Sequence, residues 1–308
     1  MRVWWLQTNP DSVFESVRSR LRREYVVIGA VVASTFFIGF GGGVIFPILP
    51  NLGAVLGISP FLVGVILSAN RFSRLLASAP AGALVDRLGT RTPMVVGMFV
   101  QGVATTGYVV AMLLPFPEGW FMLARVLWGL GSAAVFATAF TIAADVSRDD
   151  SRGASMGLVR GGVLFGFPSG VVLGGIVSEL ASNLSAFVLA TAFAFLAGGV
   201  AYLLIPETHV ADEPRSSVKP WDVNTSLPAL TVGLVNFAVL FVYIGALFST
   251  LVLLLDARDL GVFGLGPQGS SGIFMALTVL TAGAFMFASG YVTDRRESRV
   301  PALLAFLV

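Results

Sequence analysis

Long stretches without a charged residue limit what this chain can fold into. A helix needs roughly 20 apolar residues to cross the hydrocarbon core of a bilayer. Uncharged stretches long enough for a crossing run over residues 26–70, 92–117, 180–206, 223–255 and 260–293. Only 12% of the residues are charged and 56% are hydrophobic, which excludes a soluble domain. Because a backbone in lipid must satisfy its own hydrogen bonds, the sequence predicts an all-α membrane protein.

The apolar stretches divide into a series of expected helical crossings. A further apolar stretch opens at Val300 and reaches only to Val308, which is too short to span a bilayer. We therefore expect the last helix to be cut and the chain to be incomplete at its C-terminus. The expected crossings cover residues 26–49, 60–82, 92–114, 119–144, 153–178, 184–205, 228–253 and 270–293.

Polar segments divide the chain into four regions. Residues 207–227 form the longest polar linker, which separates six expected crossings from those that follow. The sequence therefore predicts a six-helix N-terminal half over 25–206 and a partial C-terminal half over 228–308. That second half would hold two complete helices and the start of a third. Residues 1–24 contain a basic amphipathic segment that suits the cytoplasmic membrane interface.

Positive charge lies almost entirely on one side of the predicted bundle. Cytoplasmic loops retain arginine and lysine during insertion. Of the 19 such residues, only Arg258 falls in a loop on the opposite side. This asymmetry predicts a cytoplasmic N-terminus in a multi-pass protein of the cell (plasma) membrane. Cysteine is absent and His209 is the single histidine, so we expect no metal site and no cofactor.

A loop motif occurs twice, once in each predicted half. The first copy spans residues 82–93 and the second spans 290–301. At a constant spacing, a glycine, an aspartate, two arginines and a proline recur in both copies. Such duplication is a known plan of membrane transporters, with the binding site between the repeats. The matching residues are Gly82, Asp86, Arg87, Arg91 and Pro93 in the first copy and Gly290, Asp294, Arg295, Arg299 and Pro301 in the second.

The residue types of the first copy indicate a contact between helix ends. Gly82 allows two helices to approach closely, and Asp86 can cap a helix N-terminus from the short turn. Arg87 and Arg91 offer forked donors to carboxylates on neighbouring helix ends, and Asp145 is the expected acceptor. The alternative is a positively charged loop without any conformational role.

These motifs resemble those of the major facilitator superfamily over essentially the whole chain. Residues 82–91, GALVDRLGTR, are similar to the signature that the family carries between helices two and three. Residues 125–131 resemble its helix-four motif, and residues 145–153 resemble the loop that follows. Residues 206–208, Pro-Glu-Thr, resemble the end of its sixth helix. The resemblance implies an MFS-type helical bundle, in which two six-helix halves rock around a central site.

The resemblance also implies a cytoplasmic latch that favours the outward-facing state. The second copy of the motif has Glu297 where the first has Gly89, so the second latch is expected to be weaker. The latch residues are Gly82, Asp86, Arg87, Gly89, Arg91 and Asp145.

Four glycines recur at every fourth residue of the fifth expected crossing. Glycines at this spacing make a flat surface for close helix packing. In drug–proton antiporters of the superfamily a similar stripe contains a Gly-Pro pair, whereas here Pro168 precedes Gly170 and Val171 follows it. Ordinary packing and a specific antiport role therefore both stay open. The stripe consists of Gly162, Gly166, Gly170 and Gly174.

Several arginines fall inside expected crossings, where a charge costs a few kcal/mol and calls for a partner or an aqueous face. Arg71, Arg125 and Arg160 are the candidates for substrate binding or coupling, and Arg74 is expected to be structural. They either bind an anionic group of a substrate or bond to carbonyls and stabilise the bundle. The resemblance associates position 125 with proton coupling. Other polar candidates are Asn70, Gln101, Asn236 and Tyr243.

These features favour a secondary active transporter that moves a small molecule by alternating access. Efflux of drug-like compounds and transport of an organic anion both stay open, with proton coupling as an option. The alternative is a truncated carrier fragment that does not transport, or a membrane assembly partner. No nucleophile–base pair or metal cluster occurs in the sequence, so no enzymatic activity is expected. The expected partners are a small-molecule substrate and the lipid bilayer, with no nucleic acid.

Overall fold

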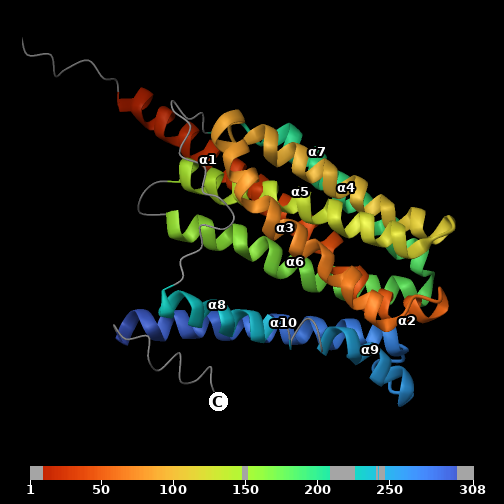
Figure 1. Ribbon diagram of the computed structural model, residues 1–308. Helices are drawn as coiled ribbons and strands as arrows, with labels where there is room; N and C mark the ends of the chain where they lie inside the picture. The colour runs from red at the N-terminus through yellow and green to blue at the C-terminus, as the bar shows by residue number, and fades with distance from the viewer. Residues whose placement is uncertain (1–9, 148–151, 209–225, 241, 243–246, 297–308) are drawn as a thin grey trace, which may run out of the picture.

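The computed structural model is a bundle of long helices that lie side by side (Figure 1). It describes residues 10–147, 152–208, 226–240, 242 and 247–296. Within these ranges every regular element is a helix. The all-α membrane fold predicted from the uncharged stretches is therefore confirmed.

The first crossing consists of two helices in series. α1 covers Pro10–Gly43 and α2 covers Ile45–Val55, and together they supply the apolar span Glu24–Gly53. The helix is interrupted next to Gly43 because Pro47 has no N–H to donate to the carbonyl four residues earlier. α2 therefore forms a separate segment at one end of the bundle (Figure 1).

The next crossings start at residues that favour helix initiation. α3 covers Pro60–Leu88 and follows Ser59, whose hydroxyl accepts a hydrogen bond from Leu62 N at 3.3 Å. α5 covers Pro117–Val146 and, like α3, begins with a proline, which suits the first helical turn because no donor is needed there. The remaining helices of the first half are α4 (Arg91–Leu113), α6 (Arg152–Leu180) and α7 (Asn183–Leu204).

Six apolar spans in the described residues are long enough to cross a membrane. They coincide with the first six expected crossings and form the six-helix N-terminal half. Many large apolar side chains are exposed on their outer surface. In a bilayer, lipid chains cover this surface. The six spans are Glu24–Gly53, Pro60–Leu88, Arg91–Leu113, Pro117–Val146, Ser155–Leu180 and Asn183–Leu204.

The part of the chain after the linker contributes three described helices. α8 covers Leu227–Leu240 and α9 covers Phe248–Ala257, and most of both falls within the seventh expected crossing, 228–253. α10 covers Pro267–Arg296 and includes the eighth expected crossing, 270–293.

α6 lies between the two groups of helices, with α1 on one side and α10 on the other (Figure 1). We call the end of the bundle at Leu88–Arg91, where α3 meets α4, the signature end. The opposite end, where Arg258–Gly266 connects α9 to α10, is the far end. The ribbons of α6 and α10 come together at the far end and separate toward the signature end (Figure 1).

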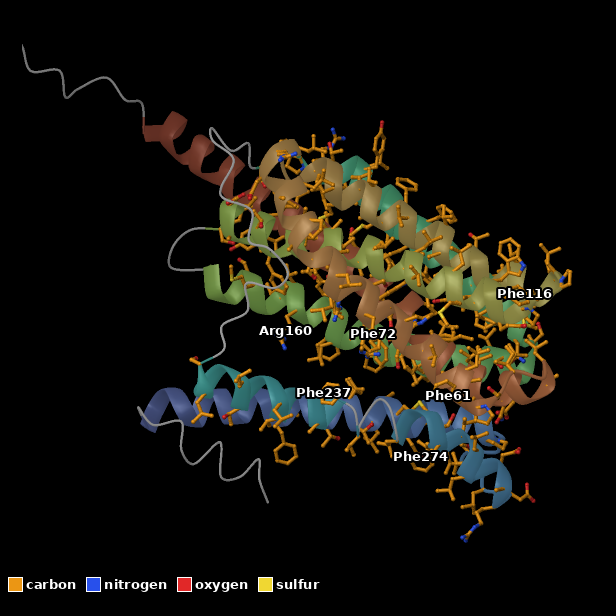
Figure 2. All side chains as sticks on the ribbon, viewed as in Figure 1. Phe61, Phe72, Phe116, Arg160, Phe237 and Phe274 are labelled. Atoms are coloured by element: carbon orange, nitrogen blue, oxygen red, sulfur yellow. The ribbon has the colours of Figure 1, made fainter. Side chains whose placement is uncertain are left out.

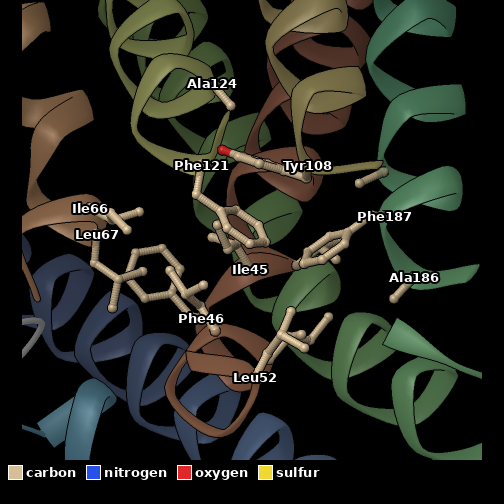
Figure 3. Packing of buried hydrophobic residues seen from close by; sticks show 14 of the residues in the cluster. Ile45, Phe46, Leu52, Ile66, Leu67, Tyr108, Phe121, Ala124, Ala186 and Phe187 are labelled. Atoms are coloured by element: carbon tan, nitrogen blue, oxygen red, sulfur yellow. The ribbon is translucent and has the colours of Figure 1, made fainter. Parts of the chain in front are cut away.

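Two clusters of buried apolar side chains fill the six-helix half. The cluster toward the far end includes Tyr108, Phe121 and Phe187, whose ring centroids lie 5.5–6.0 Å apart (Figure 3). Aromatic pairs at these separations stabilise a core beyond the effect of buried area alone. The cluster toward the signature end includes Met94 and Ile142. Together they fix the relative positions of the helices that carry the candidate site.

The glycine stripe of α6 faces α1. A Cβ on Gly166 would run into the backbone oxygen of Phe36, and one on Gly174 would lie 2.8 Å from Val44 Cα. Contacts this short leave no space for a side chain, so the stripe is a close-packing surface between α1 and α6. The specific antiport role considered for it stays a prediction. Gly162, Gly166 and Gly170 meet α1 in this way, and Gly174 meets Val44 directly after it.

Candidate functional site

A single carboxylate links the loop between α3 and α4 to the chain just after α7. Glu207 Oε1 accepts hydrogen bonds from Thr90 N at 2.6 Å and from Thr90 Oγ1 at 2.8 Å. Glu207 Oε2 accepts from Arg91 N at 3.2 Å. Backbone N–H groups at the start of a helix have no partner within the helix, and a negative charge there complements the helix dipole. Glu207 therefore supplies the cap that the side chain of Thr90 does not provide for α4.

Gly89 makes room for this carboxylate. Its φ of 78° lies in the left-handed region that favours glycine, and its N–H closes α3 by donating to Val85 O at 2.9 Å. A Cβ at this position would lie 2.5 Å from Glu207 Cδ. Both the backbone conformation and the neighbouring side chain therefore require a glycine here.

Thr208 and Tyr202 extend the network to α5 and α7. Thr208 Oγ1 lies 2.9 Å from Thr90 Oγ1 and donates to Asp145 Oδ2 at 3.4 Å. Arg91 Nη2 donates to Tyr202 O at 3.0 Å, and its guanidinium lies 5.6 Å from the centroid of the Tyr202 ring. The ends of α4, α5 and α7 thus meet in one polar cluster at the signature end.

The expected latch residues take different positions in this region. Arg91 and Asp145 both join the cluster, but Arg91 reaches Tyr202 O rather than the carboxylate of Asp145. Asp86 is half-buried and Arg87 is exposed. A Cβ on Gly82 would meet no described atom within 4 Å, so the close helix approach expected there is not seen among the described residues.

Glu207, Thr208 and Tyr202 belong to the site but were not among the candidate site residues predicted from the sequence. The Pro-Glu-Thr segment at the end of the sixth crossing is the signal that could have found the first two. A carboxylate directly after one helix is well placed to cap the start of a neighbouring helix. Nothing in the sequence indicates Tyr202, which contributes a backbone oxygen and an aromatic ring to the contact with Arg91.

Arg125 is fully buried between α3, α4 and α5. Its Nη2 donates to Leu67 O and to Asn70 Oδ1, both at 2.7 Å. Its Nε donates to Ile66 O at 3.4 Å, and its Nη1 lies 3.5 Å from the hydroxyl oxygen of Tyr108. The buried guanidinium is therefore satisfied by neutral oxygens from two neighbouring helices, and Asn70 is one of its partners.

Aromatic rings cover the remaining sides of Arg125. Its guanidinium carbon lies 5.7 Å from the ring centroid of Phe46 and 6.0 Å from that of Trp128. These distances are in the cation–π range. Gln101 Nε2 donates to Trp128 O at 3.4 Å, whereas the buried Gln101 Oε1 has no hydrogen-bond partner among the described residues.

Two further arginines lie on α3 near this cluster. Arg71 follows Asn70 and lies within electrostatic range of Arg125 and Arg74. Arg74 lies with its guanidinium 5.2 Å from the ring centroid of Phe136 on α5. Among the residues that the structure describes, the side chain of Arg71 has no hydrogen-bond acceptor. The positive charge of Arg71 is therefore partly buried without a matching acceptor.

Arg160 lies on α6, on the side that faces the second group of helices. It precedes Leu164 by one turn, and a Cβ on Gly283 of α10 would contact the Leu164 side chain at 3.0 Å. Residues four apart share a helix face. Figure 2 shows Arg160 projecting from α6 toward α8 and α10. Its side chain is exposed because α6 and α10 have separated at this level.

The remaining candidates lie in the second half, at positions where side chains are not described. Gly290, Asp294 and Arg295 belong to α10 and Asn236 belongs to α8, whereas Tyr243 and Arg299 lie outside the described residues. Their expected roles in a second latch and in substrate binding therefore stay predictions.

The described site offers positive charge and hydrogen-bond donors. Arginine side chains carry a permanent positive charge in proteins, and Arg71, Arg125 and Arg160 supply this charge here. Within the described ranges, no group of three or more acidic or histidine side chains could hold a metal ion. The arrangement can therefore attract and orient an anion.

The solved structures that resemble this fold include transporters. The structure of a bacterial homologue of the human lysosomal transporter Spinster, inward-facing and unoccupied, has a TM-score of 0.66 at 15% identity. The match covers 89% of this chain and 63% of that one, so the present chain spans less than two thirds of its length.

Two other solved structures show the same likeness. The peptide transporter POT in complex with sulfate has a TM-score of 0.61 at 17% identity, covering 87% of this chain and 69% of that one. The human organic anion transporter MFSD10 (TETRAN) has a TM-score of 0.56 at 18% identity, covering 83% of this chain and 70% of that one. At these identities the likeness shows the fold alone.

Comparisons of the sequence give the family. A search of curated protein sequences finds no match. The family model described as Major Facilitator Superfamily matches residues 31–308, which is most of the chain. The fold, the duplicated loop motif and this match lead to one conclusion: the chain belongs to the Major Facilitator Superfamily.

Proposed function

We propose that this chain forms part of a secondary active transporter that moves a small organic anion by alternating access. The observation that carries the proposal is the partly buried guanidinium of Arg71, which has no hydrogen-bond acceptor among the described residues. Arg160 supports it as a second cation, exposed on the side of α6 that faces α8 and α10. A bound anion would compensate both charges.

The distribution of carboxylates supports an anion as the missing partner. A charge within a membrane costs several kcal/mol unless a partner or water compensates it. Asp86, Glu118, Asp145 and Glu179 all lie within a turn of a helix end. No acidic residue occurs in α4 or α7. The mid-membrane arginines therefore lack an acidic side chain at their own depth in the described spans.

The fold leaves the substrate class open, so the choice rests on this chain's own arginines. Transporters of similar fold include one that carries peptides and one that carries organic anions, by their names. A pocket for neutral drug-like compounds would need no cation of this kind. The drug-efflux alternative is therefore less well supported than anion transport.

If protons drive the transport, Arg125 takes part as a fixed charge. A guanidinium keeps its proton at any physiological pH, so it cannot itself pick up and release one. The contacts of Arg125 with Leu67 O, Asn70 and Tyr108 suit a residue that orients its neighbours. Its coupling role would then be to hold Asn70 beside Arg71.

We further propose that the signature end is cytoplasmic and acts as a latch. The excess of arginine and lysine in its loops supports the orientation. The cluster formed by Glu207, Thr90 and Arg91 supports a restraint on α4 at this end. Asp86→Asn would then lower the transport rate while leaving membrane insertion unchanged. Equal rates in well-expressed variant and parent would contradict the latch.

The test of anion transport uses the full-length protein in liposomes. Uptake of labelled small mono- and dicarboxylates is compared with uptake of neutral analogues of equal size. We expect Arg71→Gln and Arg160→Gln each to raise the KM for the anion by about tenfold or more, because each removes one charge contact. Arg258→Gln, in the far-end loop, is the matched control and should have no effect.

Two results would overturn the proposal. One is normal anion uptake by well-expressed Arg71→Gln and Arg160→Gln proteins. The other is full-length protein that binds and moves no small anion, which would favour the alternative of a non-transporting assembly partner.

A further inference from the structure

A carboxylate of the first half caps a helix of the second half at the far end. Glu179, one residue before the end of α6, accepts hydrogen bonds from Gly266 N and, at 2.9 Å, from Gly269 N. These donors stand at the start of α10, where Pro267 has no N–H and the others lack a partner within the helix. The negative charge also complements the dipole of α10.

The residues next to Glu179 strengthen the same junction. Ser178 Oγ donates to Gln268 Oε1 at 2.8 Å. A Cβ on Gly175 would lie 2.7 Å from Gln268 O. Helices that approach to backbone contact over two turns leave no space for water between them. We call Ser178, Glu179, Gly266, Gln268 and Gly269 the far-end clasp.

Two glycines at the start of α10 leave room for the Glu179 carboxylate. A Cβ on Gly269 would lie 3.0 Å from Glu179 Oε2, and one on Gly266 would lie 3.2 Å from Glu179 Cδ. Both positions thus bring the backbone close to the acid. A Cβ on Gly272, one turn further along α10, would lie 2.7 Å from Val171 O.

At the signature end, α6 and α10 are not packed together as they are at the far end (Figure 1). Arg160 and Leu158 of α6 are exposed, and the ribbons of α6 and α10 lie apart there (Figure 1). Contacts between α2 and α9 lie at the far end as well. The two groups of helices are therefore joined at the far end and separated at the signature end.

We infer that Glu179 is a gate residue, whose bond to the N-terminus of α10 keeps the far end closed and must break when that end opens. The inference rests on alternating access in the proposed function for the opening step, whereas the closed contact is a feature of the structure. Glu179 is the only acidic residue that this closing contact involves among the described residues. Loss of the charge alone is expected to shift the population toward the open far end.

The test measures the far-end distance directly and needs no substrate. The 308-residue sequence contains no cysteine, so Ala181→Cys and Phe263→Cys provide two exposed labelling sites at the far end. Pulsed electron paramagnetic resonance on the spin-labelled full-length protein in nanodiscs gives the distance distribution. Leu158→Cys with Phe285→Cys reports on the other end of α6 and α10.

We expect the parent to show mainly a short far-end distance. Glu179→Gln keeps the size and one acceptor oxygen but removes the charge, so the open-to-closed ratio should rise about tenfold. Glu179→Ala should raise it further. Glu118→Gln is the matched control, because Glu118 lies in the first turn of α5 at the same end. It should leave the distribution unchanged.

Unchanged far-end distances in both Glu179→Gln and Glu179→Ala, with the proteins folded and inserted, would overturn the inference. An equal shift in Glu118→Gln would also overturn it, because the effect would then be general to acids at this end. Failure of anion uptake leaves the distance measurement valid, so the two proposals can fail separately.

Discussion

The carboxylate of Glu207 lies against the backbone N–H immediately before α4, with Oε1 2.6 Å from Thr90 N. Glu207 lies three residues after the end of α7 and is the first residue of the linker between the two halves, whereas Thr90 immediately precedes α4. The contact therefore fixes the point where the chain leaves the first half. It also holds the loop between α3 and α4 next to the start of that linker.

Replacing Glu207 should loosen this end of the first half. Glu207→Gln removes the charge that faces the N-terminus of α4 and should lower the free energy of unfolding by about 1 kcal/mol. Thr208→Val removes only hydroxyl contacts and should cost less. Thermal unfolding of the purified protein, followed by tryptophan fluorescence, measures both. Identical transition temperatures in Glu207→Gln and parent would contradict the capping role.

Gly89 should tolerate alanine poorly for two separable reasons. Gly57 has a similar φ of 73°, but a Cβ there would meet no described atom within 4 Å. Gly57→Ala should therefore cost about 1 kcal/mol of backbone strain alone. Gly89→Ala adds a collision with Glu207 and should cost roughly twice as much. Equal losses in the two variants would show that the contact with Glu207 adds nothing.

Alanine substitutions at two glycines of α6, one inside the stripe and one outside it, should change the stability of the protein differently. Gly166→Ala places a methyl group against the backbone of Phe36 and should destabilise the protein by about 1–3 kcal/mol. Gly161→Ala meets no described atom within 4 Å and should be neutral or stabilising by about 0.5 kcal/mol, because alanine favours helix. Thermal unfolding in the same detergent distinguishes them. A larger loss in Gly161→Ala would refute the packing.

Replacing Arg125 should destabilise the protein even when the substitution keeps the positive charge. Arg125→Lys retains one cation but cannot reach Leu67 O and Asn70 with the same fork, so a loss of about 2 kcal/mol is expected. Tyr108→Phe removes only a contact of 3.5 Å and should cost about 0.5 kcal/mol or less. Denaturation midpoints give the comparison. If lysine restored parental stability, the geometry of the fork would be unimportant.

Much of the architecture could be predicted because lipid imposes simple rules on sequence. The six spans of the first half follow from length and the absence of charge, and α6 packs through the glycines that their spacing indicates. The first expected crossing, residues 26–49, is formed by two helices in series, α1 and α2. Hydropathy reports that a segment is apolar, but it does not report whether its backbone forms one helix.

The partners of the candidate residues were harder to foresee. Arg125 is an expected site residue, yet its acceptors Ile66 O and Leu67 O are backbone atoms that any sequence offers at every position. Glu179 lies at a helix end, where a solvated acid is the ordinary expectation. Its role depends on α10, 87 residues away in the contact with Gly266, and only the packing of α6 on α10 brings them together.

The position of the clasp also has a mechanical consequence. α6 contains 29 residues, so it is about 44 Å long at a rise of about 1.5 Å per residue. A contact at one extremity of such a rod acts as a fulcrum. A tilt of about 10° around it moves the opposite extremity by about 8 Å, the width of a small solute, with little sliding at the fulcrum itself. A few hydrogen bonds at one end of α6 can thus govern a displacement that is more than twice their own length.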